Sequence, residues 1–327
     1  GVVKAGAAYA AIDPDGSAGQ LAVLLDGSSV ALAVSRAEDA DAPGLQGREW
    51  LDLAELAAEA DSAAPISDAE RGCPVRVANL AYVVGPAQSG ERAGPVAMPQ
   101  SGAAGLVAAF GKVTGTLDDD PDTRILHLAK PGTDRAFAET AWAVTMGHTL
   151  VIVAPGSESG GDLGEILDAG EVTDLMVTPG DLDSVDPDSA EYVRNLILVA
   201  ASCPDEVVVQ WQARGRRLFT AYDDAGMMGS VTRSRVTGRA PITAGRPVDG
   251  VAVRVLGEHA TAVRAGETGA LAFAGSGLAR GYLGAAAETA ARFVADPCGE
   301  PGTRMYRASE CGRIVEDHLE IVVEGSE

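Results

Sequence analysis

Aromatic side chains, lysines and long apolar runs are all scarce in this chain of 327 residues. Aromatics make up 4% of the residues, so the 46% that are hydrophobic are mostly Ala, Val, Leu and Ile. Such residues suit a core of parallel strands under helices rich in small side chains. No stretch reaches the roughly 20 continuous apolar residues of a membrane span, and the N-terminus lacks a charged start followed by an apolar signal segment. A cytoplasmic protein with no membrane partner is therefore expected.

Metal-binding cysteine patterns and positive charge are missing as well. The four cysteines, Cys73, Cys203, Cys298 and Cys311, are scattered without a CxxC pair, so we expect reduced thiols and no metal site. The chain has 25 Lys and Arg against 47 Asp and Glu, a net charge of −22. This charge would repel phosphate backbones and anionic lipid, so nucleic acid and membrane surfaces are not expected partners.

The apolar pattern alternates between strands and helices up to about residue 225. Residues 125–129, 136–146 and 149–153 have the strand, helix and strand patterns of a βαβ unit, which favours a parallel crossover. The other predicted strands of this part are 30–34, 78–84, 172–177 and 196–201, and the predicted helices are 51–60, 163–167, 205–211 and one that ends over 21–25.

After Gly226 the pattern changes to strands with Gly-rich turns, over residues 251–256, 269–274 and 314–323. We therefore predict an α/β fold of layered parallel or mixed sheets with flanking helices, plus a smaller β-rich part. The predicted division is an α/β core over residues 1–225 and a β-rich subdomain of the same core over residues 226–327.

Several segments resemble amino-acid-activating enzymes. Residues 275–283 read GSGLARGYL, residues 289–297 read TAARFVADP and residues 301–307 read PGTRMYR. Upstream, residues 3–14 read VKAGAAYAAIDP, and residues 245–248 read GRPV. In this order the segments are similar to those of nonribosomal peptide synthetase adenylation domains, which belong to the acyl-adenylate-forming enzymes. The resemblance covers nearly the whole chain and implies the large core of that fold.

The resemblance implies a reaction in which an amino acid carboxylate attacks the α-phosphate of ATP, with Mg²⁺ as the metal. Such chemistry needs a Gly-rich phosphate loop, a magnesium ligand and lysine. The family's YTSGSTGRPKG loop is matched here by residues 85–95, GPAQSGERAGP, in which Glu91 brings a carboxylate and Gly94 replaces the lysine. This loop is predicted to repel a triphosphate.

Two further signatures are partly kept. The family's NAYGPTE appears as residues 220–226, where Tyr222 keeps the adenine-stacking tyrosine while Ala225 and Gly226 replace threonine and glutamate. Asp223 and Asp224 could hold a metal, but an aspartate pair in a surface turn favours a solvated bend. The YRTGDL signature, whose aspartate binds ribose, appears as residues 306–311 with Glu310 in the acidic position.

The substrate-binding signature FDxSxxE is matched by residues 133–139, which keep Asp134, the family's partner of the substrate ammonium. Arg135 beside it is predicted to offer a salt bridge where that amine should bind. Asp134 is therefore interpreted as vestigial or as an N-terminal helix residue. Tyr222 and Glu310 are interpreted as vestigial nucleotide-binding residues, with no catalytic residue and no metal ligand.

The resemblance also implies that the opening part of the family's large domain and the C-terminal lid, with its catalytic lysine, are absent. The three lysines, Lys4, Lys112 and Lys130, match neither catalytic lysine. The first hypothesis is thus a pseudo-adenylation domain without cofactor, a spacer or docking platform for adjacent condensation, peptidyl carrier or tailoring proteins. Two alternatives stay open: residual amino acid adenylation with ATP and Mg²⁺, and amino acid or nucleotide binding without turnover.

Overall fold

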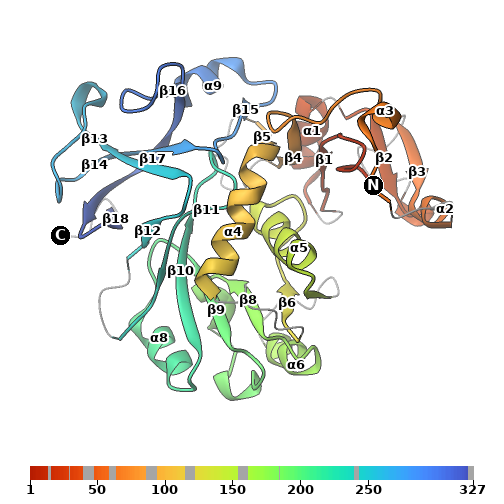
Figure 1. The fold of residues 1–327 in the computed structure, drawn as a ribbon. Helices are drawn as coiled ribbons and strands as arrows, with labels where there is room; N and C mark the ends of the chain where they lie inside the picture. Colours follow the sequence, from red (N-terminus) through yellow and green to blue (C-terminus); the bar gives the residue numbers. More distant parts are fainter. Residues whose placement is uncertain are drawn as a thin grey trace. The chain divides into compact units, whose positions relative to one another are not determined.

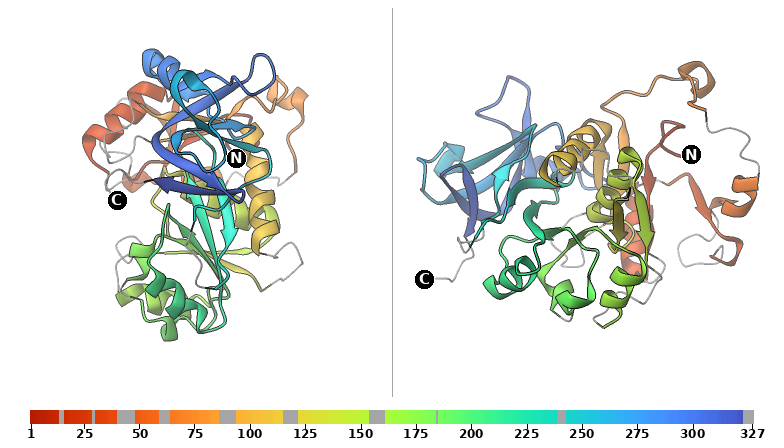
Figure 2. Two further views of the ribbon diagram at one scale, coloured as in Figure 1. Left: turned by 90° about the vertical axis from the view of Figure 1, so that its left-hand side faces the viewer. Right: turned by 60° about the horizontal axis from the view of Figure 1, so that its bottom comes forward.

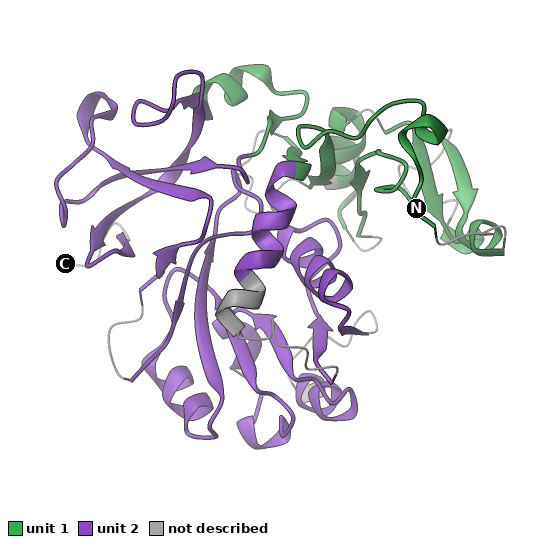
Figure 3. Ribbon diagram, in the orientation of Figure 1, with its two compact units in different colours: residues 1–100, 279–291 green, residues 101–278, 292–327 purple. Residues whose placement is uncertain are grey.

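The computed structural model describes residues 1–13, 16–28, 30–39, 48–58, 64–85, 94–114, 122–153, 161–183, 185–238 and 243–322. The chain forms two compact units (Figure 3). Unit 1 comprises Gly1–Gln100 and Ala279–Ala291, and unit 2 comprises Ser101–Leu278 and Arg292–Glu327. The boundary expected at residues 225 and 226 falls inside unit 2 and stays a prediction.

Unit 1 holds a four-stranded mixed sheet in the order β1-β4-β5-β15 and a two-stranded parallel sheet, β2-β3. The strands are β1 Tyr9–Ala10, β2 Leu32–Ser35, β3 Glu49–Asp52, β4 Leu80–Val84, β5 Val96–Pro99 and β15 Gly281–Tyr282. The helices are α1 Ala18–Ser28, α2 Leu53–Ala58 and α3 Asp68–Arg71, and α9 Ala286–Arg292 begins here. The core of the four-stranded sheet lies on β4 and β5, where residues 96–98 have no exposed surface.

Unit 2 is built on a seven-stranded sheet in the order β12-β11-β10-β9-β8-β6-β7 (Figure 1). Its strands are β6 Arg124–His127, β7 Thr149–Ile152, β8 Asp174–Val177, β9 Asn195–Val199, β10 Arg217–Asp223, β11 Ser230–Arg235 and β12 Arg246–Pro247. The strands from β7 to β10 pair in parallel, and β11 and β12 pair antiparallel. The helices are α4 Ala103–Thr114, α5 Asp134–Met146, α6 Gly161–Ala169, α7 Pro179–Leu182 and α8 Asp205–Gln212.

One face of this sheet packs against α6 and α8. Side chains alternate between the two faces of a strand, so every second residue of the parallel strands points to this side. Buried residues there include Leu126, Leu175, Leu196 and Leu218, which pack with Leu163, Leu167, Val208 and Trp211 of the two helices. The apolar runs that predicted these strands therefore form the core.

The second sheet of unit 2 confirms the predicted β-rich part (Figure 2). It contains β13 Val251–Leu256, β14 Gly269–Gly275, β16 Phe293–Ala295, β17 Arg304–Val315 and β18 His318–Val322. The single strand predicted over residues 314–323 is wrong, because Glu316 (φ 49°) and Asp317 (φ 67°) turn the chain back into a hairpin of β17 and β18. No helix in the described part of the chain combines the length and the apolar character that a membrane crossing requires.

Candidate functional site

Two of the three residues predicted to have belonged to an active site, Tyr222 and Asp134, lie at the carboxyl ends of parallel strands in unit 2. Tyr222 lies near the end of β10, and the N-terminus of α5 follows the end of β6. Open α/β sheets bind ligands at this edge, because the loops that leave the strands converge there. The sheet topology thus places these segments where a ligand site is expected.

Tyr222 is buried, and its ring centroid lies 6.1 Å from that of Phe273 on β14. Its hydroxyl has no hydrogen-bond partner among the described residues. Burial raises the pKa of Tyr222, and the nearby charges of Asp224 and Glu310 raise it further. Two of the three residues singled out in the sequence, Tyr222 and Glu310, are therefore close enough to interact.

Gly226 lies directly under the aromatic ring of Tyr306. A Cβ added at Gly226 would come within 2.1 Å of Cγ and 2.4 Å of Cδ1 of Tyr306. Tyr306 is buried and also packs against Phe293, with 5.0 Å between the ring centroids. The space beside Gly226, where the family signature has glutamate, is therefore filled by Tyr306.

Glu310 lies on β17 where the pairing with β14 is irregular. Ala272 pairs with Arg307, whereas Ala270 pairs with Cys311, so β17 has two more residues than β14 in this interval. A bulge of this kind bends a strand and redirects its side chains, and bulges are frequent beside active sites. Glu310 lies within this irregular interval, and it is exposed.

The aspartate pair does not form one solvated bend. Asp223 is the last residue of β10, opposite Ser230 on β11, and its Oδ1 is shielded without a hydrogen-bond partner among the described residues. Desolvation raises the pKa of Asp223, while a hydrogen bond from Ser230 and the charge of Arg233 oppose the rise. The interpretation as a surface turn is wrong for Asp223, because the antiparallel β11 covers it.

Arg233 is the cationic partner in this buried pair. It is 4% exposed, and its Nη2 donates to Oγ of Ser230 at 2.9 Å. Burial lowers the pKa of Arg233 to about 10, and the charge of Asp223 limits the fall. Asp223 is thus engaged by protein groups in a position where a metal ligand could otherwise act.

The start of α5 is fixed by a side-chain cap. Thr133 Oγ1 accepts a hydrogen bond from the Ala136 amide at 3.2 Å, and Gly147 ends the helix with φ 72°. Asp134 is the first residue of the helix and is half-buried. A carboxylate in the first turn is stabilised by the helix dipole whether or not a ligand is present.

Arg135 directs its guanidinium to other carboxylates. Nη1 lies 3.3 Å from Oδ2 of Asp181, and Nε lies 3.8 Å from Oε1 of Glu139. The positive charge of Arg135 also opposes the rise in the pKa of Asp223. The start of α5 and the end of β10 therefore lie close enough to interact electrostatically. The ion pairs of Arg135 differ from the predicted pairing with Asp134, since the carboxylates on α5 and α7 are within reach.

Glu139 is a buried carboxylate that the sequence signature contained but that we gave no role. It has no exposed surface and accepts from His127 Nδ1 at 2.8 Å and from the Ala129 amide at 3.2 Å. Desolvation raises the pKa of Glu139, and the hydrogen bond from His127 and the charge of Arg135 oppose the rise. This cluster ties the end of β6 to α5.

Other predicted positions fall outside or away from this neighbourhood. Residues 86–93, the centre of the loop compared with the family's phosphate loop, lie outside the described residues. Within the described ranges, no group of three or more His, Cys, Asp or Glu side chains is arranged to hold a metal ion.

Comparison with known proteins decides the family. Residues 95–283 match the model of a family described as AMP-binding enzyme. The chain belongs to that family. It is 31% identical over 96% of its length to the probable non-canonical nonribosomal peptide synthetase CymA of Salinispora arenicola. It is 34% identical over 94% of its length to novobiocin biosynthesis protein H of Streptomyces niveus.

The AMP-binding match and these relatives identify a nonribosomal peptide synthetase adenylation-domain family member. Its fold is similar to that of the nonribosomal peptide synthetase FmoA3, with a TM-score of 0.83 over 99% of this chain and 35% of the other at 22% identity. The chain spans 4% of CymA and 52% of novobiocin biosynthesis protein H. The predicted family and the predicted α/β fold are thus confirmed, while the roles of Asp134, Tyr222 and Glu310 stay predictions.

Proposed function

We propose that this adenylation-family chain is a pseudoenzyme, a non-catalytic domain that acts as a spacer or docking platform within or beside a peptide synthetase. The observation that carries the proposal is the packing of Tyr306 on Gly226, with 2.1 Å between Cγ and an added Cβ. In the family signature this position supplies the magnesium ligand. A residue without a side chain, under a buried ring, offers no oxygen to a cation.

The neighbouring acidic groups do not replace that ligand in our proposal. Asp223 is held by Ser230 and Arg233, and binding of a cation there would have to compete with a buried guanidinium. Asp224 Oδ1 accepts from the Gly226 amide at 2.9 Å, so it closes the local turn. These contacts support our proposal that the domain acts without ATP and Mg²⁺.

The amine-binding position supports the same conclusion. Arg135 follows Asp134 directly, and its side chain, which is 21% exposed, pairs with Asp181 and Glu139. An incoming ammonium group would meet a fixed positive charge next to the carboxylate that should hold it. Asp134 is then retained for the first turn of α5.

The partners we propose follow from the relatives. CymA is named a nonribosomal peptide synthetase, and this chain corresponds to 4% of it, so the matched region lies within a much longer protein. Neighbouring condensation and peptidyl carrier domains, or tailoring proteins, are therefore the proposed partners. A domain that keeps its core while losing charged site residues can still present a stable surface to them.

Amino-acid-dependent exchange of pyrophosphate into ATP tests the proposal. We expect no exchange above a boiled sample for any amino acid, with a competent adenylation domain assayed in parallel. Sustained exchange that disappears in Asp134→Asn and persists in Asp168→Asn, an exposed aspartate on α6, would overturn it. That outcome would establish the residually active alternative.

A second candidate, nucleotide binding without turnover, is favoured by Tyr222, whose buried hydroxyl has no hydrogen-bond partner among the described residues and whose surroundings include Glu310. Calorimetric titration with AMP and ATP distinguishes this candidate from a pure scaffold. Saturable heat that is lost in Tyr222→Leu but kept in Tyr192→Leu, an exposed tyrosine, would support binding, and the absence of heat supports the scaffold.

A further inference from the structure

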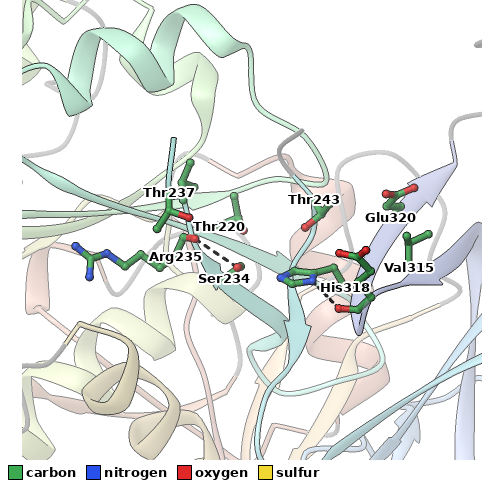
Figure 4. A pocket seen from close by; sticks show the side chains of 10 residues that line it. Thr220, Ser234, Arg235, Thr237, Thr243, Val315, His318 and Glu320 are labelled. Carbon is green, nitrogen blue, oxygen red and sulfur yellow. Dashed lines mark hydrogen bonds between the residues drawn. The ribbon is translucent and has the colours of Figure 1, made fainter. Parts of the chain in front are cut away.

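A cavity of about 320 Å³ opens in unit 2. One wall is formed by β10 and β11 with the segment that follows β11, and the other by the β17–β18 hairpin (Figure 4). None of Asp134, Tyr222 and Glu310 lines it. Its volume is near the lower end of ligand pockets, roughly 300–1,000 Å³, and suits a molecule with the size of an amino acid or a dipeptide.

The first wall carries hydroxyl groups. Thr220, Ser234 and Thr237 contribute to it, and Figure 4 shows Thr220 and Ser234 close together. Thr220 is 3% exposed, yet its Oγ1 has no hydrogen-bond partner among the described residues. A buried hydroxyl without a partner costs free energy that a bound polar ligand would recover.

Arg235 provides a positive charge on the side of this wall. It is exposed, and no ion pair or hydrogen bond of its guanidinium is found among the described residues. Arg235 is among the residues that line the cavity, and Figure 4 shows its guanidinium directed outward, on the side away from His318. Guanidinium groups bind carboxylates through two parallel N–H donors.

The opposite wall presents acceptors. His318 Nδ1 lies 3.0 Å from the carbonyl oxygen of Glu316, and since a carbonyl can only accept, Nδ1 carries the proton. In the neutral ring Nε2 is then an acceptor. The carboxylates of Glu316 and Glu320 also line this wall, and Glu320 Oε2 is already engaged by Nε of Arg313 at 2.7 Å. Glu316 and His318 are therefore the acceptors on this wall that no cation engages among the described residues.

The hairpin that brings these acceptors to the cavity is held in an uncommon backbone conformation. Glu316 and Asp317 have φ values of 49° and 67°, in the left-handed region that glycine and asparagine adopt more readily. A two-residue hairpin turn requires positive φ at both positions, and the pairing of Val315 with His318 makes Glu316 and Asp317 such a turn. The turn thus places Glu316 and His318 on the same wall of the cavity.

We propose that this cavity binds a small zwitterion, an amino acid or a dipeptide, with its carboxylate toward Arg235 and its ammonium toward Glu316 and His318. The separation of opposite charges at the two ends selects a ligand that carries both. The hydroxyl of Thr220 gains a partner on the ligand. None of Asp134, Tyr222 and Glu310 lines this cavity, so the proposal does not depend on the proposed function.

The test is calorimetric titration of the full chain with L-alanine and glycylglycine, and with ethylamine and acetate as probes that carry a single charge. We expect saturable binding of at least one zwitterion at millimolar concentration or below, and binding of the single-charge probes that is weaker by about tenfold or more, the effect of one lost charged contact. Heat changes that do not saturate for either zwitterion would overturn the proposal.

Three variants identify the site. Glu316→Asn keeps a residue that tolerates the left-handed turn, Arg235→Gln removes the guanidinium, and Thr220→Val removes a hydroxyl that has no partner in the free chain. Each should weaken zwitterion binding by about tenfold while the melting temperature stays the same or rises. Arg264→Gln, which changes an exposed arginine outside the cavity, should bind as the unaltered chain does. Equal affinity of all four variants would place the binding elsewhere and refute the assignment.

Discussion

The aromatic ring of Tyr306 occupies the space into which a side chain at Gly226 would project, with 2.1 Å between Cγ of Tyr306 and an added Cβ. The two residues are far apart in sequence, one after β10 and one on β17. Their contact joins the seven-stranded sheet to the β-rich sheet of unit 2. Any restoration of the lost glutamate must first displace this ring.

Gly226→Glu should therefore destabilise the chain without producing adenylation. Overpacking a well-filled interior costs about 1–3 kcal/mol, and the added carboxylate increases the cost. Denaturant unfolding measures the loss. Gly105→Ala is the matched control, since the nearest atom to its added Cβ is 3.9 Å away and alanine favours the helix. A Gly226→Glu variant as stable as the Gly105→Ala variant would contradict the packing described here.

The Asp223–Arg233 pair predicts a non-additive pair of substitutions. Arg233→Met should cost about 3–5 kcal/mol, because it leaves a buried carboxylate without its cation. Asp223→Asn in the same chain should recover part of that loss, since the remaining buried charge is removed. Urea unfolding of the two single variants and the double variant checks this. Additive losses would show that Asp223 and Arg233 do not interact.

Glu139 predicts a defined pH dependence. Its pKa in the folded chain is raised above the ordinary value of 4.5, mainly by desolvation. The unfolded chain then loses this proton at a lower pH than the folded chain does. The corresponding stability is present below pH 4.5 and is lost as pH rises through the raised pKa.

The melting temperature of Glu139→Gln relative to the unaltered chain should accordingly rise between acid and neutral pH, because glutamine has no proton to lose. Glu165→Gln, an exposed position on α6, should show no such trend. A difference for Glu139→Gln that falls as pH rises would mean that the contacts with His127 and Arg135 outweigh desolvation.

The cap of α5 predicts a smaller effect. Thr133→Ala removes the acceptor of the Ala136 amide and should cost about 1 kcal/mol. Thr145→Ala on the exposed face of the same helix should change stability by less than about 0.5 kcal/mol. Thermal unfolding distinguishes the two variants. Equal effects would show that Thr133 does not determine the start of the helix.

The local helices and strands, and the family, could be predicted from the sequence alone. The predicted helix over residues 136–146 and the strands on either side are present as α5, β6 and β7, because apolar periodicity and a capping residue act locally. The turn of the hairpin over residues 304–322 was not predicted, because Glu316 and Asp317 are not the residues that such turns favour.

The contacts of the site could not be predicted in the same way. Tyr306 on Gly226, Arg233 beside Asp223 and His127 on Glu139 each join residues from different elements. No periodicity or short motif encodes such pairs. Asp223 is an example: the acidic pair Asp223-Asp224 favoured a solvated turn in the sequence, whereas in the structure the neighbouring strand β11 covers Asp223.

Pyrophosphate release in a single turnover, with the chain in excess over ATP and with each amino acid present in turn, tests the central claim most directly. Because Gly226 offers no magnesium ligand and Tyr306 fills its place, we predict no release above the rate without protein. Amino-acid-dependent release that approaches one pyrophosphate per ATP would contradict the account.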